Sequence, residues 1–262
     1  MSTKTAYKSI VIKIGTSTLA YDTGLLNIRN MEKLVKVIAD IKNMGTDIIL
    51  VSSGAIGVGL GKLGIKTRPK DTPSKQAAAA VGQCELMYVY DKLFSEYNHK
   101  IAQILLTADV LDHEKTRSNV KNTFDKLKET GVIAIINEND TVSVEEIEFG
   151  DNDTLSADVA ILTNADALVI LSDIDGLYDA NPTEDENAKL ITDVYDIDEK
   201  ITSVAGGSSG MLGTGGMTTK VRAAARVTQN GIDMFIVNGS CADNLYEIMN
   251  DRNAGTKFHA KR

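Results

Sequence analysis

The chain has 262 residues, of which 43% are hydrophobic and 24% are charged, and its formal net charge is −8 with a pI near 5.0. This composition is typical of a globular protein that is large enough to bury a substantial core. An acidic chain is a poor partner for nucleic acid or for an anionic membrane, and its apolar runs are too short to span a bilayer. We therefore expect a cytoplasmic protein that binds neither.

Apolar runs alternate with amphipathic segments along most of the chain. We predict strands at 9–15, 47–55, 100–107, 131–140, 166–176 and 233–239. Apolar residues at helical spacing predict helices at 28–44, 74–97, 115–130, 154–163, 218–231 and about 242–250. The acidic stretch 179–190 leads into an expected excursion of strands or turns. This alternation indicates an α/β fold, in which helices cover both faces of a mostly parallel sheet.

Ligands bind such sheets beyond the carboxyl ends of the strands. The candidate site is therefore made by the residues that follow each predicted strand: Lys13 to Thr16, Ser52 to Ala55, Asn137 to Asp140, Ser172 and Asp173, and Asn238 and Gly239.

The stretch GTGGMTTK at 213–220 predicts a phosphate-binding loop. Its glycines allow the backbone to approach a ligand closely, and the helix that follows directs its positive dipole end at an anion. Lys220 lies in the first turn of that helix, where a cation is unfavourable unless an anion is bound beside it. A flexible glycine loop with a surface lysine is the simpler alternative.

Lys13 interrupts the apolar strand VIKIG. In a parallel sheet with both faces covered, a lysine near the carboxyl end of a strand is buried and needs an anionic partner. Asp153 in the stretch GDNDTLSADVA is a carboxylate that can orient two lysines, while Asp151 and Asn152 beside it face a small polar ligand. A capped helix start explains only one of these three polar residues.

Other features do not indicate a site. The stretch GLGKLG at 59–64 matches a dinucleotide pattern but begins too far after its strand, so we expect a mobile loop near the substrate. We expect Cys84 and Cys241 to be reduced and buried. The three histidines, at 99, 113 and 259, lack the spacing of zinc ligands.

Several motifs together resemble the glutamate 5-kinase family of the amino-acid kinase superfamily. They are VIKIGTSTL, LVSSGAIGVG, INENDTVS, FGDNDTLSADVA, LSDIDGLYDANP and GTGGMTTKVRAAARVTQNGI, and the resemblance covers essentially the whole chain. It implies a three-layer αβα sandwich with a mainly parallel eight-stranded sheet. It also implies a single kinase domain over 1–262, with a glutamate-binding lobe at 1–165 and an ATP-binding lobe at 166–262. Many members of the family carry a C-terminal PUA domain, and we expect this chain to depart from them in lacking it.

The resemblance implies ATP-dependent phosphorylation of the γ-carboxylate of L-glutamate to L-glutamyl 5-phosphate, the first step of proline biosynthesis. The implied catalytic residues are Lys13, Lys220 and Asp153. The implied glutamate-binding residues are Ser53, Gly54, Ala55, Asn137, Asp140, Asp151 and Asn152. The implied ATP-binding residues are Lys13, Gly15, Ser172, Asp173, Thr214, Gly215, Gly216, Met217, Thr218, Thr219 and Lys220.

The expected cofactors are ATP and Mg²⁺, with the metal carried by the ATP phosphates rather than by a protein site. We expect a homodimer or homotetramer, with glutamyl phosphate reductase acting next. Two alternatives stay open: an acetylglutamate kinase-like enzyme, or a non-catalytic sensor of ATP and an amino acid. Asp140 and Asp151 suit a free α-ammonium group, and a sensor does not need both lysines together with Asp153.

Overall fold

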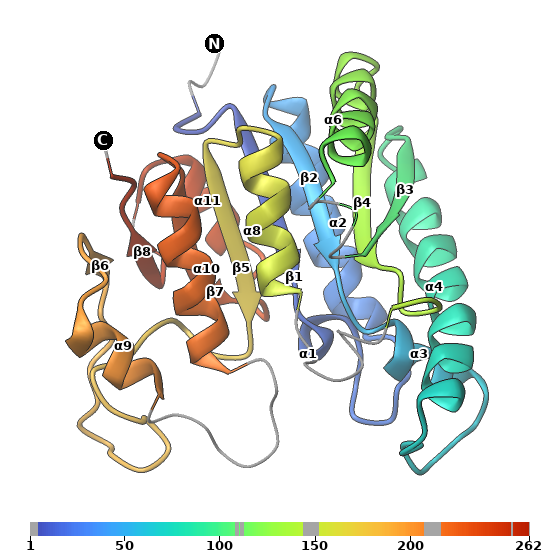
Figure 1. Cartoon of the computed structure of the whole chain (residues 1–262), viewed down its shortest axis with the longest axis horizontal. Coiled ribbons are helices and arrows are strands. Elements are labelled where there is room, and N and C mark those ends of the chain that lie inside the picture. Colours follow the sequence, from blue (N-terminus) through green and yellow to red (C-terminus); the bar gives the residue numbers. More distant parts are fainter. Residues whose placement is uncertain are drawn as a thin grey trace.

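The computed structural model describes residues 5–107, 110, 113–143, 152–206, 216–252 and 254–261. Within these ranges, strands and helices alternate along the chain (Figure 1). The strands are β1 (Ser9–Ile14), β2 (Asp47–Ser52), β3 (Ile101–Leu106), β4 (Ile133–Glu138), β5 (Ala167–Ser172), β6 (Asp193–Val194), β7 (Asp233–Asn238) and β8 (Thr256–Phe258). The helices are α1 (Thr16–Leu19), α2 (Ile28–Asn43), α3 (Ala55–Lys62), α4 (Thr72–Ser95), α6 (Glu114–Glu129), α8 (Asp153–Leu162), α9 (Glu199–Gly206), α10 (Met217–Gln229) and α11 (Asn244–Met249).

The strands form one eight-stranded sheet in the order β3-β4-β2-β1-β5-β7-β8-β6. Every described pairing is parallel except that of β7 with β8. The predicted α/β class and the mainly parallel eight-stranded sheet are therefore confirmed. Because β1 pairs with both β2 and β5, the sheet is continuous across the two lobes predicted for 1–165 and 166–262.

Helices cover both faces of the sheet (Figure 1), and each face has its own core. Strand alternation separates the residues of β1 between them. Ile10, Ile12 and Ile14 pack with residues of α2, α3, α4 and α11. Val11 packs in the other core with residues of α8 and α10, and Lys13, two positions later, shares its face.

Local signals fix where two of the long helices begin. Asn27 caps α2, since its side chain accepts a hydrogen bond from the backbone N–H of Asn30 at 3.2 Å. Asp71 caps α4 in the same way by accepting from the N–H of Ser74 at 2.9 Å, and Pro73 fits the first turn. None of the helices in the described ranges is long and apolar enough to cross a membrane.

Most predicted strands and helices are present, but the described ranges contain three short helices that were not predicted. They are α1, α3 and α9, and α9 lies in the region expected to contain only strands or turns. The predicted strands at 47–55 and 166–176 were too long, because β2 ends at Ser52 and β5 at Ser172.

The prediction that 59–64 is a mobile loop was wrong, because most of it belongs to α3. Its glycines allow close helix packing. A Cβ atom at Gly59 would lie 1.8 Å from the carbonyl oxygen of Ala78 in α4, and one at Gly61 would lie 2.6 Å from the backbone of Gly24. Glycine is therefore required where α3 contacts its neighbours, and this explains the pattern without a nucleotide.

The prediction that both cysteines are buried was also wrong, because Cys84 and Cys241 are exposed. Cys84 follows the buried residues Gly82 and Gln83 on α4 but lies on the solvent face of the helix. Cys241 lies in the turn between β7 and α11.

Candidate active site

Three charged side chains meet at the carboxyl edge of the sheet. The Nζ atom of Lys13 lies 2.7 Å from Oδ1 of Asp153, and Nζ of Lys220 lies 3.1 Å from Oδ2 of the same carboxylate. The exposed fractions are 5% for Lys13, 7% for Lys220 and 0% for Asp153. Asp153 thus contacts both lysines, and its predicted role in orienting them stays a prediction. We call these residues the charged trio.

Each member of the charged trio comes from a different element on one face of the sheet. Lys13 lies one residue before the end of β1 and points to the face covered by α8 and α10. Asp153 is the first residue of α8, and Lys220 lies in the first turn of α10. The fold therefore brings Lys220 next to Asp153, which lies 67 positions earlier in the sequence.

The helix dipoles affect these charges differently. A carboxylate in the first turn of α8 is favourable, whereas a lysine in the first turn of α10 is not. Asp153 offsets this cost, and the hydroxyl of Thr219 also donates to its Oδ2 at 2.9 Å. Two lysines share one carboxylate, so the charged trio has one positive charge in excess, which favours an anionic ligand.

Buried amides extend from the charged trio toward β2 and β4. The Nδ2 group of Asn152 donates to the Ser52 carbonyl oxygen at 2.7 Å, to Oδ1 of Asn137 at 2.7 Å and to Oγ of Ser53 at 3.1 Å. Asn137 in turn donates from Nδ2 to Oε1 of Gln83 at 2.9 Å. Asn152 and Asn137 are 1% and 0% exposed, so this amide chain is part of the interior.

The turn between β2 and α3 brings the predicted residues Ser53, Gly54 and Ala55 to the same edge. Gly54 has φ +90°, a left-handed conformation that glycine adopts without strain. A Cβ atom there would also lie 3.3 Å from the side chain of Thr16, so the turns after β1 and β2 are in contact. Ser53 is 5% exposed and bonded to Asn152.

Asp140 lies two residues beyond the end of β4 and is 4% exposed. The strand predicted to run to this residue ends at Glu138, but the turn that follows keeps Asp140 at the carboxyl edge. Asp151, which was also predicted to bind substrate, lies outside the described residues.

The predicted ATP-binding residues that are described lie at the ends of β1 and β5 and at the start of α10. The backbone N–H of Gly15 donates to the Leu171 carbonyl at 3.2 Å, and the Ser172 hydroxyl donates to Asp173 at 3.1 Å. Gly216 caps α10, which begins with Met217, and the Thr218 hydroxyl donates to the Ala205 carbonyl at 3.2 Å. Thr214 and Gly215 lie outside the described residues.

The sequence did not indicate two polar residues of α4 that contact strand ends. Gln83 bonds Asn137, and the hydroxyl of Tyr90 lies 3.3 Å from that of Ser52. Burial raises the pKa of Tyr90. The only sequence signal was a glutamine after Gly82 within a run of small and apolar residues, and this pattern is compatible with many roles.

Among the residues that the structure describes, no group of three His, Cys, Asp or Glu side chains could hold a metal ion. A hollow of about 710 Å³ borders the same edge, and it is lined by residues that include Thr16, Ser17, Gly57 and Arg68.

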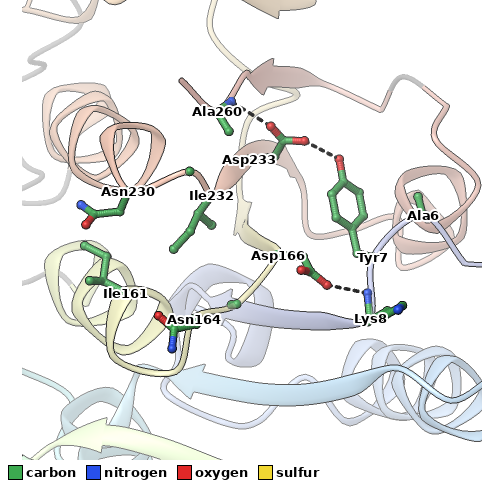
Figure 2. Close-up of a pocket in the computed structure, with 12 residues that line it drawn as sticks. Ala6, Tyr7, Lys8, Ile161, Asn164, Asp166, Asn230, Ile232, Asp233 and Ala260 are labelled. Atoms are coloured by element: carbon green, nitrogen blue, oxygen red, sulfur yellow. Dashed lines mark hydrogen bonds between the residues drawn. The ribbon is translucent and has the colours of Figure 1, made fainter. Parts of the chain in front are cut away.

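A pocket of about 560 Å³ lies at the opposite edge, where β1, β5 and β7 begin (Figure 2). Figure 2 shows Asp233 between the hydroxyl of Tyr7 and the backbone of Ala260, and Asp166 pointing at the backbone of Lys8. Parallel α/β sheets place their catalytic sites at the other edge. The carboxyl edge is therefore the candidate active site.

Comparison with known proteins agrees with this geometry. Residues 8–238 match the amino acid kinase family. The chain is 53% identical over 259 residues to glutamate 5-kinase of Clostridium perfringens (strain 13 / Type A), with 97% of this chain and 96% of the relative covered. It is 48% identical to glutamate 5-kinase of Listeria monocytogenes serotype 4a, with 97% and 94% covered.

Solved structures share the fold at low identity. Carbamate kinase from Giardia lamblia superposes with a TM-score of 0.65 at 16% identity, covering 100% of both chains. UMP kinase from Bacillus anthracis superposes with a TM-score of 0.64 at 17% identity, covering 98% of this chain and 97% of the other. The sequence match and the shared fold thus agree, and the chain belongs to the amino acid kinase family and, within it, to the glutamate 5-kinases.

Proposed function

We propose that the chain transfers the γ-phosphoryl group of ATP to the γ-carboxylate of L-glutamate, producing L-glutamyl 5-phosphate in the first step of proline biosynthesis. The relatives named above carry this activity in their names, and their match extends over nearly the whole chain. The observation that carries the proposal is the charged trio, in which Asp153 bridges Lys13 and Lys220 at the edge where α/β sheets bind ligands.

The chemistry requires little beyond position and charge. The γ-carboxylate of glutamate has an ordinary pKa of about 4.3, so it is ionised at neutral pH and needs no general base. The barrier comes from bringing this anion in line with a phosphate that is also anionic. Lys13 and Lys220 supply positive charge from two directions, and Asp153 fixes their positions before the substrates arrive.

Glutamate fits the side of the charged trio that faces β2 and β4. Ser53 and Gly54 form the turn there and Ala55 begins α3. Asn152 and Asp140 supply polar side chains, with Asn137 behind them. Asp140 is the proposed partner of the α-ammonium group, because a carboxylate paired with an ammonium is a strong hydrogen-bonding contact. Asp151 belongs to this proposal on sequence grounds alone.

ATP fits the side of the charged trio that faces β5 and α10. The start of α10 at Gly216 offers backbone N–H groups and a positive dipole end, and both favour phosphate. Ser172 ends β5 and Asp173 follows it at the same edge, and the backbone N–H of Gly15 donates to the Leu171 carbonyl of β5. This division gives the two lobes, 1–165 and 166–262, their proposed ligands.

Mg²⁺ enters this proposal on the ATP phosphates, where it neutralises charge. We further propose that the chain assembles as a homodimer or homotetramer. Because water hydrolyses an acyl phosphate, the proposal also includes a glutamyl phosphate reductase that consumes the product.

The direct test is turnover by the purified chain. ADP release should require L-glutamate and Mg²⁺ together, and hydroxylamine should trap the acyl phosphate as a hydroxamate. N-acetyl-L-glutamate, aspartate, carbamate and UMP serve as competing acceptors. Equal ADP release with any of these four would reject the assignment, and preference for N-acetyl-L-glutamate would favour the acetylglutamate kinase alternative. ATP and glutamate binding without turnover would indicate a sensor.

A further inference from the structure

Gln83 lies on α4 at a position that the packing of α4 against α3 determines. A Cβ atom at the preceding residue, Gly82, would lie 1.8 Å from the carbonyl oxygen of Ala55, so only glycine permits this approach. The approach leaves Gln83 9% exposed, with its Oε1 atom 2.9 Å from Nδ2 of Asn137. Ala55 is the first residue of α3, directly after the turn that follows β2, and Asn137 lies near the end of β4.

The orientation of each amide in this chain follows from its backbone partners. The backbone N–H of Glu138 can only donate, and it lies 3.0 Å from the Asn137 side-chain oxygen. The amide atom that faces this N–H must therefore be the oxygen, Oδ1, and Nδ2 of Asn137 is directed toward Gln83. Gln83 must then present Oε1, because two facing NH₂ groups cannot bond.

The other end of the chain is fixed in the same way. The Ser52 carbonyl oxygen can only accept, and it lies 2.7 Å from Nδ2 of Asn152. The same Nδ2 group reaches Oδ1 of Asn137 at 2.7 Å and Oγ of Ser53 at 3.1 Å. The Oδ1 atom of Asn152 is consequently directed away from both the β2 carbonyl and Asn137.

We propose that Gln83 is a positioning residue for glutamate, and this proposal rests on the proposed function. Gln83 holds Asn137, which holds Asn152, and Asn152 contacts Ser53 on one side and immediately precedes Asp153 on the other. The amide chain thereby sets the glutamate-binding groups relative to the charged trio without itself reaching ATP.

Position matters in such a site, because a displacement of about 1 Å can lower a rate by roughly a hundredfold. Loss of the Gln83 acceptor leaves Nδ2 of Asn137, a residue that is 0% exposed, without this bond. The Glu138 N–H and the Ser52 carbonyl still set which way the two amides face, but the Asn137 side chain loses one of the contacts that hold its position. Asn137 and Asn152 can then shift, and the contact between Asn152 and Ser53 is no longer held in place. Glutamate binding should weaken while ATP binding stays nearly constant.

The test compares Gln83→Met with Gln83→Glu in the full chain. Methionine keeps the volume of glutamine but removes the acceptor, whereas a glutamate carboxylate can still accept from Nδ2 of Asn137. Gln76→Met, on the same helix, is the matched control, because Gln76 lies outside the amide chain. The measurements are kcat, KM for each substrate, glutamate affinity by calorimetry and the melting temperature.

We expect Gln83→Met to raise the KM and the Kd for glutamate about tenfold, with the KM for ATP changed less than about twofold. For Gln83→Glu, the KM and the Kd for glutamate should stay within about threefold of the wild-type values. Gln76→Met should have the wild-type values. An unchanged glutamate KM in Gln83→Met would overturn the proposal. So would a proportional rise in both KM values with a lower melting temperature, because that pattern indicates general loss of structure. If the wild-type chain neither binds nor phosphorylates glutamate, the proposed function itself fails and the positioning role fails with it.

Discussion

The two edges of the sheet each bury an aspartate beside lysine, but the partners differ. At the carboxyl edge, Asp153 contacts two lysines, Lys13 and Lys220, at 2.7 and 3.1 Å. At the amino edge, Asp233 accepts from the Tyr7 hydroxyl and from the Ala260 N–H at 2.8 Å each, and Lys257 lies 3.3 Å away.

The partners of Asp233 suit a structural role. Burial alone would raise the pKa of Asp233, but the hydrogen bonds from Ala260 and Tyr7 and the charge of Lys257 outweigh burial and lower it below 3.8. These partners come from the segment before β1 and from the segment around β8, so one carboxylate joins the two ends of the chain. Here one negative charge meets one positive charge and neutral donors, whereas the charged trio carries an extra cation.

A buried lysine–aspartate pair therefore does not by itself indicate a catalytic site. Two features distinguish the edges: the ratio of cations to carboxylates and the end of the strands at which the group lies. Substitutions at the carboxyl edge should change catalysis, and substitutions at the amino edge should change stability. A substitution with the opposite effect would contradict this division between the edges.

The largest effect is expected for Lys13→Ala and Lys220→Ala. Each removes one cation placed to act on the transferring phosphoryl group, and loss of one such contact costs roughly 2.7–4 kcal/mol of barrier, or about 10²–10³ in kcat. Lys8→Ala, an exposed lysine just before β1, is the control and should behave as wild type. Steady-state kinetics with glutamate and ATP measure the effect. A kcat within a few-fold of wild type in either variant would remove that lysine from the mechanism.

Asp140→Asn should have the next largest effect. If Asp140 pairs with the α-ammonium group of glutamate, neutralising it should cost on the order of 2 kcal/mol in kcat/KM. Glutarate, which lacks the amine, should be a poor substrate for wild type, and the variant should narrow the gap between glutamate and glutarate. The measurement is kcat/KM for both acceptors in both proteins. Equal losses on the two acceptors would show that Asp140 is structural, although it lies at the carboxyl edge.

Asp233→Asn should change stability rather than catalysis. Asparagine keeps one acceptor but loses the charge beside Lys257, so we expect a loss of roughly 1.5 kcal/mol in the free energy of unfolding at pH 7. Asp251→Asn is the matched control, because the Asp251 side chain is 75% exposed and its contact with Lys257 is 3.6 Å. Urea unfolding measures the loss, and kcat should remain unchanged.

Acid pH should reduce that difference. The folded-state pKa of Asp233 lies below its usual 3.8, so the contribution of the carboxylate is present above that value and is lost as the pH falls through the lowered pKa. The gap between wild type and Asp233→Asn should therefore be constant from pH 6 to 7 and shrink below about pH 4. A reduced kcat at pH 7 in Asp233→Asn would instead show that the amino edge is coupled to catalysis at the carboxyl edge.

Much of the fold and part of the site could be predicted from the sequence. Strands of Ile and Val and amphipathic helices have strong periodic patterns, and Lys13 was conspicuous because it interrupts such a strand. Asp153 could be predicted as the partner of Lys13, because the carboxyl ends of parallel strands meet at one edge of the sheet. The resemblance to a known family then supplied the roles, which the structure leaves as proposals.

Other features could not be predicted, for physical reasons. The glycines of α3 resemble a loop in sequence because the contact that requires them, with Ala78, is made by another helix. Gln83 and Asn137 are 54 positions apart, and no local pattern links them. Tyr7 and Asp233 are 226 positions apart, so the group at the amino edge was not visible either.

The smallest effect is expected at alkaline pH in Tyr7→Phe. Burial, together with the hydrogen bond to Asp233, raises the pKa of Tyr7 from 10.0 to about 12. An unfolded chain would ionise this tyrosine near pH 10 while the folded protein holds its proton, so the contribution of Tyr7 to stability is fully present below pH 10 and is lost as the pH rises toward 12.

At pH 8, loss of the hydroxyl in Tyr7→Phe should lower the free energy of unfolding by about 1 kcal/mol. By pH 11 the gap between wild type and Tyr7→Phe should have narrowed, because only wild type has lost the contribution of Tyr7. Tyr246 also has a pKa of about 12, but both proteins contain it and its effect cancels in the difference. Urea unfolding at pH 8, 10 and 11 measures the gap, and a gap that stays constant would show that the Tyr7–Asp233 bond does not hold the amino edge together.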